Sequence, residues 1–323
     1  MSHVAYVTLI ALSAGAGFYV VLVAGLSLVT WLLLTRRPPH DPEDIKARLL
    51  ERGEILPEWL ERDWIDERVR TPGGYELAVH GRAGQNGRLA VVHHGVSWNW
   101  LGSLKYGQFF LEHGYSVVLL DARGHGESGG GRPSFGIFES RDLASVLAWG
   151  RSRFPSAGGT VILGVSLGAA TALEYAPRDS DLAAVIADCP FSSAEAEVDH
   201  RLMRAMIPAF VRRPALRVVD ALCRHVDGFS MREAAPAASC LETKAPMLFI
   251  HGLGDDYVPF AMSEAMASAR RRALPEALTE ILLVPGAGHA KSHRTDPAAY
   301  EAAVLAFLEL AFEIRSREPR SAR

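Results

Sequence analysis

Residues 159–176 limit the possible folds of this chain more than any other stretch. Thr160–Leu163 is a short β-branched and apolar run typical of a buried strand, and the alanine-rich segment after Leu167 is typical of a helix. Between them lies Gly164-Val165-Ser166-Leu167-Gly168, a G-x-S-x-G sequence. Such a turn lifts a serine hydroxyl clear of the sheet edge and leaves no room for a Cβ at either glycine. The alternative is that Ser166 only caps the helix.

Strand-like and helix-like segments alternate along most of the remaining chain. A hairpin is predicted at 65–70 and 75–80, and further strands at 89–93, 116–120, 161–163, 183–187, 247–250 and 281–284. Helices are predicted at 101–113, 139–152, 167–176, 260–273 and 297–315. This alternation predicts an α/β fold with a mostly parallel eight-stranded sheet and helices on both faces. Such sheets bind ligands at the carboxyl ends of their strands.

Residues 191–240 interrupt this alternation, because they carry no strand signal. They contain Met203, Met206 and Phe210 among apolar residues at roughly helical spacing. A connection of about fifty residues between two strands is too long to be a plain loop. We therefore expect a helical cap over the strand ends. The alternative is an extra packing layer remote from any pocket.

No Asp, Glu, Lys or Arg occurs from Val4 to Leu34. A helix of ~20 apolar residues spans a bilayer core, so this run predicts one transmembrane helix within an anchor of residues 1–37. The alternative is a secretory signal peptide, for which Ala14-Gly15-Ala16 offers a cleavage pattern. Against it, no Lys or Arg precedes the run, and the run continues well past that point.

The flanks of the run predict its orientation. Tyr6 and Trp31 lie near its two ends, where interfacial aromatic residues belong. Arg36 and Arg37 follow it, whereas only His3 and the α-amine precede it. The positive-inside rule then places the rest of the chain in the cytoplasm, which makes this a single-pass membrane protein with a cytoplasmic domain.

Two further regions complete the predicted organisation. Residues 38–62 begin with prolines and become rich in Glu and Arg, which predicts a linker with a solvated or interfacial juxtamembrane helix. Residues 63–318 form the globular domain and include the cap at 191–240. The formal net charge of -3 gives no basic footprint for nucleic acid. Three cysteines without C-x-x-C spacing argue against a disulfide scaffold.

Ser166 is a weak nucleophile unless a base stands beside it. His289 follows the last predicted strand, so its loop is expected at the same sheet edge as the serine. A buried carboxylate must hold such a histidine in one tautomer. Asp255 and Asp256 both follow the strand at 247–250 and are both candidates. The chain order Ser, Asp, His differs from the trypsin-like and subtilisin-like orders.

An acyl-transfer reaction also needs two backbone N–H donors for its oxyanion. Leu167 is positioned to supply one, directly after the serine and at the start of a helix. Val96, in the loop His94-Gly95-Val96 after an earlier strand, is positioned to supply the other. We expect His94 itself to hydrogen-bond the backbone and hold this loop.

Residues 64–315 resemble the serine α/β-hydrolase superfamily, and most of all its cap-bearing bem46-like and serine-aminopeptidase or monoacylglycerol-lipase-like branch. In that family the acid stands three positions after the histidine-glycine of its loop and three before the valine-proline, which is Asp255 here. The resemblance thus implies a triad of Ser166, Asp255 and His289, with Val96 and Leu167 as oxyanion donors. The matching stretches are 94–96, 121–128, 164–168, 251–259 and 288–289.

The resemblance says less about the substrate. It implies a small-molecule carboxylic ester or thioester, and an apolar cap beside a membrane favours a lipid-like acyl chain. A peptidase or an acyltransferase on the same triad is the alternative, and a non-catalytic scaffold is a third. Many relatives have small residues where this chain has the cluster at 98–100, which changes the acyl pocket. The expected pocket residues are Trp98, Phe191, Met203, Met206 and Phe210.

Neither a cofactor nor a metal is expected. Residues 124–129 match G-x-G-x-x-G after a strand, but Gly130, Gly131 and Pro133 follow, so no helix N-terminus is available for a pyrophosphate. We expect Asp121 and Arg123 to hold this loop as a pair. His289 and His293 stand at i, i+4, a spacing that could mimic a zinc site, but the glycine-rich loop around His289 argues against a continuous helix there. The sequence gives no indication of the oligomeric state.

Overall fold

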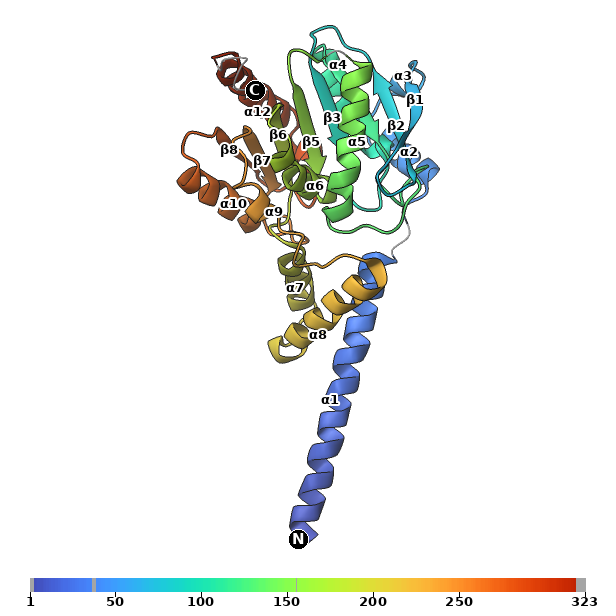
Figure 1. Ribbon diagram of the computed structural model, residues 1–323, viewed down its shortest axis with the longest axis vertical. Coiled ribbons are helices and arrows are strands. Elements are labelled where there is room, and N and C mark those ends of the chain that lie inside the picture. Colours follow the sequence, from blue (N-terminus) through green and yellow to red (C-terminus); the bar gives the residue numbers. More distant parts are fainter. Residues whose placement is uncertain (1–2, 37–38, 155, 318–323) are drawn as a thin grey trace.

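A computed structural model describes residues 3–36, 39–154 and 156–317 (Figure 1). Arg37 and Pro38, at the junction of the predicted anchor and linker, lie outside the described residues, as does residue 318. The strands are β1 Ile65–Arg70, β2 Glu76–Arg82, β3 Leu89–His93, β4 Ser116–Leu120, β5 Thr160–Val165, β6 Leu182–Asp188, β7 Met247–Gly252 and β8 Thr279–Val284. The helices are α1 His3–Thr35, α2 Pro42–Glu51, α3 Pro57–Leu60, α4 Trp100–Glu112, α5 Ile137–Arg153, α6 Leu167–Tyr175, α7 Ala194–Arg204, α8 Ala209–Leu222, α9 Pro236–Ser239, α10 Phe260–Ala273, α11 Ser292–Thr295 and α12 Pro297–Arg317.

The eight strands form one sheet in the order β1-β2-β4-β3-β5-β6-β7-β8. β2 runs antiparallel to both of its neighbours, and the other pairs are parallel. The register brings the carboxyl ends level, since Val165 pairs with Asp188 and Gly252 pairs with Val284. The loops after β3, β5, β7 and β8 therefore meet at one edge. The predicted mostly parallel eight-stranded sheet is confirmed.

Helices cover both faces of the sheet, because successive strand residues point to opposite sides. Val161 and Leu163 of β5 belong to an apolar cluster with residues of α4 and α12. Ile162, between them, belongs to a second cluster with residues of α5 and α6, which lie in front of the sheet in Figure 1. All three side chains are fully buried. The predicted arrangement of helices on both faces is confirmed.

The segment between β6 and β7 is helical, as predicted. It forms α7, α8 and α9, and the first two lie together below the sheet in Figure 1. Val198 and Leu202 of α7 share an apolar cluster with Leu216 and Val219 of α8. This cluster also contains Phe191, so the cap packs onto the domain at the carboxyl ends of the strands.

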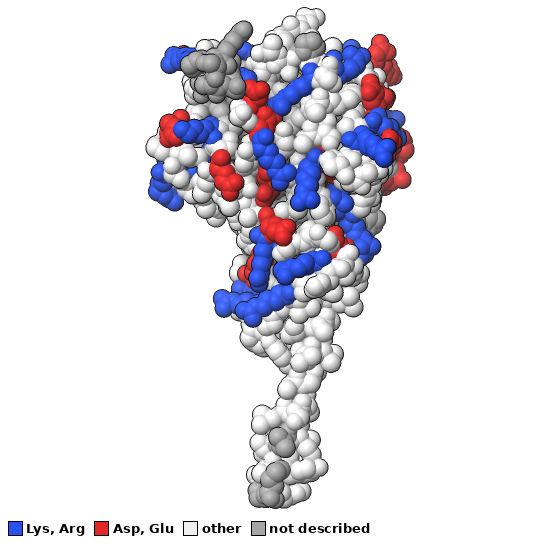
Figure 2. All heavy atoms as spheres, in the orientation of Figure 1, with Lys and Arg blue, Asp and Glu red and all other residues white. Residues whose placement is uncertain are grey.

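Helix α1 has 33 residues and extends well beyond the rest of the molecule (Figure 1), and its protruding part shows no charged side chain in Figure 2. Among the described residues it is the one helix long and apolar enough to cross a membrane. Its second half packs along α8, where the Tyr19 hydroxyl donates to the Phe210 carbonyl over 2.6 Å. Trp31 Nε1 donates to Asp227 Oδ2 over 2.6 Å, and the ring is buried in the cap cluster. Trp31 is therefore a cap contact, although the sequence pattern placed it at a membrane interface.

Much of the predicted linker, 38–62, packs on the globular domain. Ile45 and Leu49 of α2 are buried with α4 residues, although we expected a solvated or interfacial helix. Their i, i+4 spacing gives α2 an apolar face that the surrounding charges obscured. The His40 N–H also donates to the Ser97 carbonyl over 2.9 Å, which ties this segment to the loop after β3.

Candidate active site

Ser166 stands at the turn between β5 and α6 with a φ of 54°, a conformation that residues other than glycine seldom adopt. A Cβ on Gly164 would lie 2.1 Å from the Gly168 carbonyl oxygen, and one on Gly168 would lie 2.2 Å from the His93 carbonyl oxygen. The predicted need for both glycines is confirmed. The Ser166 side chain makes no capping hydrogen bond to α6, so it does not serve as the helix cap.

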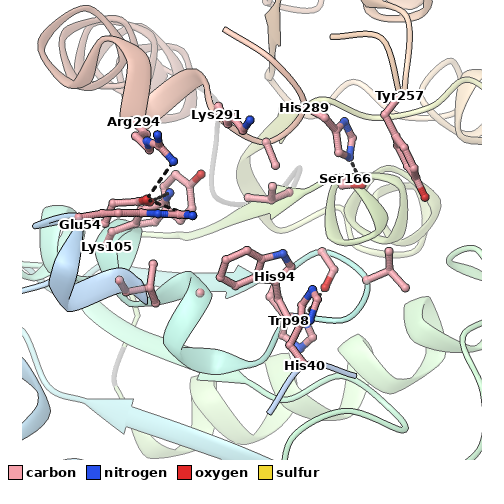
Figure 3. Close-up of a pocket in the computed structure, with 18 residues that line it drawn as sticks. His40, Glu54, His94, Trp98, Lys105, Ser166, Tyr257, His289, Lys291 and Arg294 are labelled. Atoms are coloured by element: carbon pink, nitrogen blue, oxygen red, sulfur yellow. Dashed lines mark hydrogen bonds and ion pairs between the residues drawn. The ribbon is translucent and has the colours of Figure 1, made fainter. Parts of the chain in front are cut away.

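The His289 ring lies between Ser166 and Asp255. Its Nε2 is 2.9 Å from Ser166 Oγ (Figure 3), and its Nδ1 is 2.7 Å from Asp255 Oδ2. A carboxylate only accepts hydrogen bonds, so Nδ1 carries the proton and Nε2 accepts from the serine hydroxyl. The loops after β5, β7 and β8 thus bring together three side chains that the sequence placed far apart.

Both oxygens of the buried Asp255 carboxylate accept hydrogen bonds. Oδ1 accepts the N–H groups of Tyr257 and Val258 over 3.0 and 2.9 Å, and Oδ2 lies 3.1 Å from His251 Nε2. Burial by itself raises the pKa of Asp255, but hydrogen bonds from His251 and His289 hold that pKa well below its usual value. The carboxylate is therefore ionised at neutral pH.

Asp256, the other candidate acid, lies outside this arrangement. Its side chain is 73% exposed and pairs with Arg204 over 3.0 Å. The Asp255 side chain has no exposed surface. The geometry therefore selects Asp255 as the partner of His289.

Two neutral histidines hold the loop after β3. His94 Nε2 accepts the Ala122 N–H over 2.9 Å, and its Nδ1 donates to the Gly95 carbonyl over 2.7 Å. His125 Nε2 accepts the Ser97 N–H over 2.9 Å. Burial lowers the pKa of both rings, which keeps them uncharged. His94 thus makes the backbone contacts that we expected of it.

The loop after β3 passes close to the serine. A Cβ on Gly95 would lie 3.3 Å from the Val165 carbonyl oxygen and 3.4 Å from Ser166 Cβ, so this loop passes directly beside the serine. Val96 follows Gly95 and borders the same cavity as Ser166. Within the part of the chain that the structure describes, the N–H groups of Val96 and Leu167 donate to no protein acceptor. Both residues border the smaller cavity that Ser166 also borders.

Comparison with known proteins agrees with this geometry. The model of the Alpha/beta hydrolase family matches residues 77–303. The chain belongs to the alpha/beta hydrolase family. The Bacillus subtilis protein YqkD, described as uncharacterized, is 34% identical over 239 residues, which cover 73% of this chain and 74% of YqkD.

Solved structures share the fold of this α/β hydrolase at low sequence identity. The Pyrococcus furiosus esterase Pf2001 superposes with a TM-score of 0.64 and 19% identity, over 84% of this chain and 97% of that one. The Pyrococcus horikoshii acylaminoacyl peptidase superposes with a TM-score of 0.57 and 16% identity, over 77% of this chain and 41% of that one. These likenesses support the fold and leave open which relative shares its substrate.

Two cavities of the α/β hydrolase meet at Ser166. The larger has a volume of about 300 Å³ and is bordered by Trp98, as expected of that residue. The smaller, of about 40 Å³, is bordered by Phe191, also as expected. Leu33 and Leu34 of α1 border the smaller cavity too, so the end of the apolar helix reaches the serine.

Three other expected pocket residues border neither cavity. Met203, Met206 and Phe210 are 47%, 86% and 67% exposed and lie on the outer side of the cap. The expectation was wrong for Met203 and Phe210 because each stands next to, not on, the inward face of its helix, and for Met206 because it lies in the turn between α7 and α8. That face carries Leu202 in α7 and Val211 in α8.

The sequence analysis did not single out two residues that support the site. His251 Nε2 faces both Asp255 Oδ2 and the Val258 carbonyl, and its Nδ1 lies 2.7 Å from Ser263 Oγ. The Tyr257 ring lies 4.8 Å from the His289 ring, centroid to centroid, and borders both cavities. Their place in the 251–259 loop, beside the acid, was the available signal.

The expected Asp121–Arg123 pair does not form. Asp121 instead accepts the N–H groups of Trp100 and Glu127, both over 2.8 Å. The Arg123 guanidinium lies over the rings of Tyr75 and Phe138. The carboxylate still fixes the 124–129 loop, but through backbone donors.

Three side chains near the serine are of the types that bind metal ions and lie close together. The ligand atoms of Cys189, Asp255 and His289 lie within 4.8 Å of one another. Burial raises the pKa of the Cys189 thiol well above its usual value, and Asp255 and His289 already bond to each other. These observations favour a protonated thiol that packs beside the histidine.

Asp188, at the end of β6, is a fully buried carboxylate outside the hydrogen-bonded chain of Ser166, His289 and Asp255. Burial raises its pKa to about 6, against the opposing influence of Lys105. A folded-state pKa above the unfolded value means that the native state binds more protons. Stability should therefore fall as the pH rises from about 4 to 6, by ~3 kcal/mol at most.

We expect Asp188→Asn to remove this pH dependence. The variant should unfold at a higher temperature than the wild type at pH 8, and the difference should shrink to about a third at pH 4.5. Thermal unfolding of both proteins at the two pH values measures the difference. An equal shift at both pH values would contradict the buried-charge explanation.

Proposed function

We propose that this protein is a serine hydrolase that cleaves a carboxylic ester or thioester. Ser166 Oγ attacks the acyl carbonyl while His289 Nε2 takes its proton, and Asp255 stabilises the imidazolium that forms. The N–H groups of Val96 and Leu167 bind the oxyanion. The carbonyl–leaving group bond then breaks, and His289 returns the proton to the leaving alcohol or thiol. Water, activated by His289, releases the acid from the acyl-serine in a second round.

The observation that carries this proposal is the unbroken hydrogen-bonded chain from Ser166 Oγ through His289 to Asp255, at 2.9 and 2.7 Å. The fold likeness to Pf2001, named as an esterase, adds support for an ester substrate. Incubation with a fluorophosphonate probe and with 4-nitrophenyl esters of several chain lengths tests it. An unlabelled and inactive wild-type protein would exclude the proposal.

A peptidase or an acyltransferase on the same three residues is the alternative. The fold likeness to an acylaminoacyl peptidase keeps the first version open. Faster hydrolysis of aminoacyl amides than of 4-nitrophenyl esters would favour a peptidase. Turnover that depends on an added acyl acceptor would favour a transferase.

We also propose that α1 anchors the protein in a membrane and that the outer side of the cap rests on the bilayer. The part of α1 before Tyr19 has no buried side chain among those described, and it is roughly 24 Å long at 1.5 Å per residue. A hydrocarbon core is ~30 Å thick. A full span must therefore continue past Tyr19, which brings Phe210 to the membrane surface because Tyr19 contacts it.

The orientation of the anchor is inferred from Arg36, which follows the apolar run. Arg36 also pairs with Asp227 of the cap over 3.1 Å, so this end of α1 lies beside the domain. The positive-inside rule places this end, and with it the catalytic domain, in the cytoplasm. Complete protection of the domain from protease in right-side-out vesicles would support this. Digestion from outside would reverse the orientation, and a mature chain that begins after Ala16 would indicate a signal peptide.

A fluorophore at position 206 should report the bilayer contact. The three native cysteines are buried, so Met206→Cys offers one accessible thiol for an environment-sensitive dye. On reconstitution into lipid vesicles its emission should shift to shorter wavelength, because the dye enters an apolar layer. Ala265→Cys, on the exposed side of α10, is the matched control and should not respond. An unchanged spectrum at position 206 would place the cap away from the membrane.

A further inference from the structure

The larger cavity changes character along its length. At one end lie Ser166 and His289, and at the other end lie Glu54, Lys105 and Arg294 (Figure 3). Apolar and aromatic residues form much of the remaining cavity wall, among them Leu49, Trp98, Tyr106 and Ala290. A molecule with its carbonyl at the serine therefore extends along an apolar passage toward charged side chains.

The charges at the far end are unbalanced. Four cationic side chains border the cavity, Arg52, Lys105, Lys291 and Arg294, and Glu54 is the one carboxylate among the residues that line it. The nearest nitrogen of Lys105 lies 2.7 Å from that carboxylate, whereas those of Arg52 and Arg294 lie 3.8 and 3.9 Å away. One carboxylate cannot neutralise four cations, so this end of the cavity carries a net positive charge.

The charged side chains at this end of the cavity differ in how exposed they are. The side chains of Glu54 and Lys105 are each 8% exposed and form a close ion pair. The side chains of Arg52 and Arg294 are 41% and 44% exposed, at the long end of ion-pair range from Glu54. Lys291 makes no ion pair among the described residues and stands between this group and His289. The buried pair thus leaves Arg52, Lys291 and Arg294 available to an anion.

We propose that the substrate of this site is an ester that carries an anionic group, a carboxylate or a phosphate, at its end remote from the reacting carbonyl. Arg52, Lys291 and Arg294 bind that group, and the buried Lys105 adds to the positive field. Guanidinium groups bind such oxyanions through paired hydrogen bonds, and these charge-assisted bonds are stronger than neutral ones. The proposal rests on the proposed ester hydrolysis at Ser166 and adds the class of substrate to it.

Substrate pairs that differ only in the remote charge test the proposal. The first pair is the mono-4-nitrophenyl ester of adipic acid and its methyl-capped diester, where the charge lies on the acyl side. The second pair is oleoyl lysophosphatidate and mono-oleoylglycerol, where the charge lies on the alcohol side. We expect kcat/KM to favour the anionic member of one pair by about tenfold or more. The favoured pair identifies which side of the ester occupies the cavity.

Variants connect the preference to the cavity. The double variant Lys291→Met/Arg294→Gln should bring the ratio of anionic to neutral kcat/KM close to one, chiefly through KM. Arg272→Gln, an exposed arginine on α10 outside this cavity, is the matched control and should keep the ratio. High salt should also reduce the ratio, because mobile ions screen exposed charges.

The results of these experiments distinguish a failure of the proposed anion site from a failure of the proposed ester hydrolysis. Turnover of neutral esters without any preference for either anionic substrate would overturn the anion site and leave the hydrolase intact. If no ester is cleaved, the proposed function fails, and the anion site is still tested by calorimetry. Ser166→Ala should bind the anionic member of one of the two pairs more tightly than its neutral partner, and equal affinities within both pairs would exclude the site.

Discussion

Ser166→Ala should abolish fluorophosphonate labelling and lower kcat for 4-nitrophenyl esters by about 10⁴-fold or more. The reason is geometric, because Ser166 Oγ is the hydroxyl that lies within hydrogen-bond distance of His289 Nε2. Removal of the oxygen leaves the base without a nucleophile to activate. Ser268→Ala, an exposed serine on α10, is the control and should leave labelling unchanged.

The double variant Ser166→Ala/His289→Ala strengthens this test. When two residues act together in one catalytic step, substitution of either one removes most of the activity. The second substitution should therefore lower kcat little further. Independent effects that multiply would contradict a shared mechanism. Equal labelling of the wild type and Ser166→Ala would assign the reactive hydroxyl to another residue.

Local pattern and chain order were enough to predict the sheet and the Ser–His contact. The β-branched run before Ser166 and the glycines on each side of it left one steric solution, a sharp turn at the carboxyl end of a strand. Parallel strands align their carboxyl ends, so the loop of His289 had to meet the same edge. These are consequences of periodicity and backbone sterics, which a single sequence carries.

The cap surface and the charged end of the cavity were beyond such reasoning. Met203 and Leu202 are neighbours in sequence with similar polarity, and only the packing of α7 against α8 decides which one points inward. Glu54 and Arg294 lie far apart along the chain and meet because α2 and α11 both pack against α4, the latter through the contact of His293 with Tyr106. Surface charges carry no periodic signal that indicates such a meeting.

The choice between Asp255 and Asp256 was a similar case, because two adjacent carboxylates give the same sequence signal apart from family resemblance. The structure separates them through the Tyr257 and Val258 N–H groups, which fix one carboxylate in the interior. Asp256 points to solvent beside Arg204. The difference between the two residues is one of backbone geometry. It predicts very different effects on kcat for Asp255→Asn and Asp256→Asn, which are the same chemical change.

Asp255→Asn should lower kcat by about 10³- to 10⁴-fold while the chain still folds. The asparagine oxygen can still accept the backbone N–H groups at Oδ1, but its NH2 group replaces Oδ2 and faces His289 Nδ1. A donor at this position favours the tautomer in which Nδ1 is unprotonated and Nε2 carries the proton. His289 then cannot accept the Ser166 proton, although the serine, the oxyanion donors and both cavities are intact.

Asp256→Asn is the matched control, since the same chemical change is made one residue away at an exposed side chain. It should keep kcat within about twofold, because exposed ion pairs such as Asp256–Arg204 contribute little. Steady-state kinetics of both variants, with thermal unfolding to verify folding, measures the contrast. Normal activity of Asp255→Asn together with loss in Asp256→Asn would reverse the assignment. Normal activity in both would mean that His289 needs no carboxylate to act as a base.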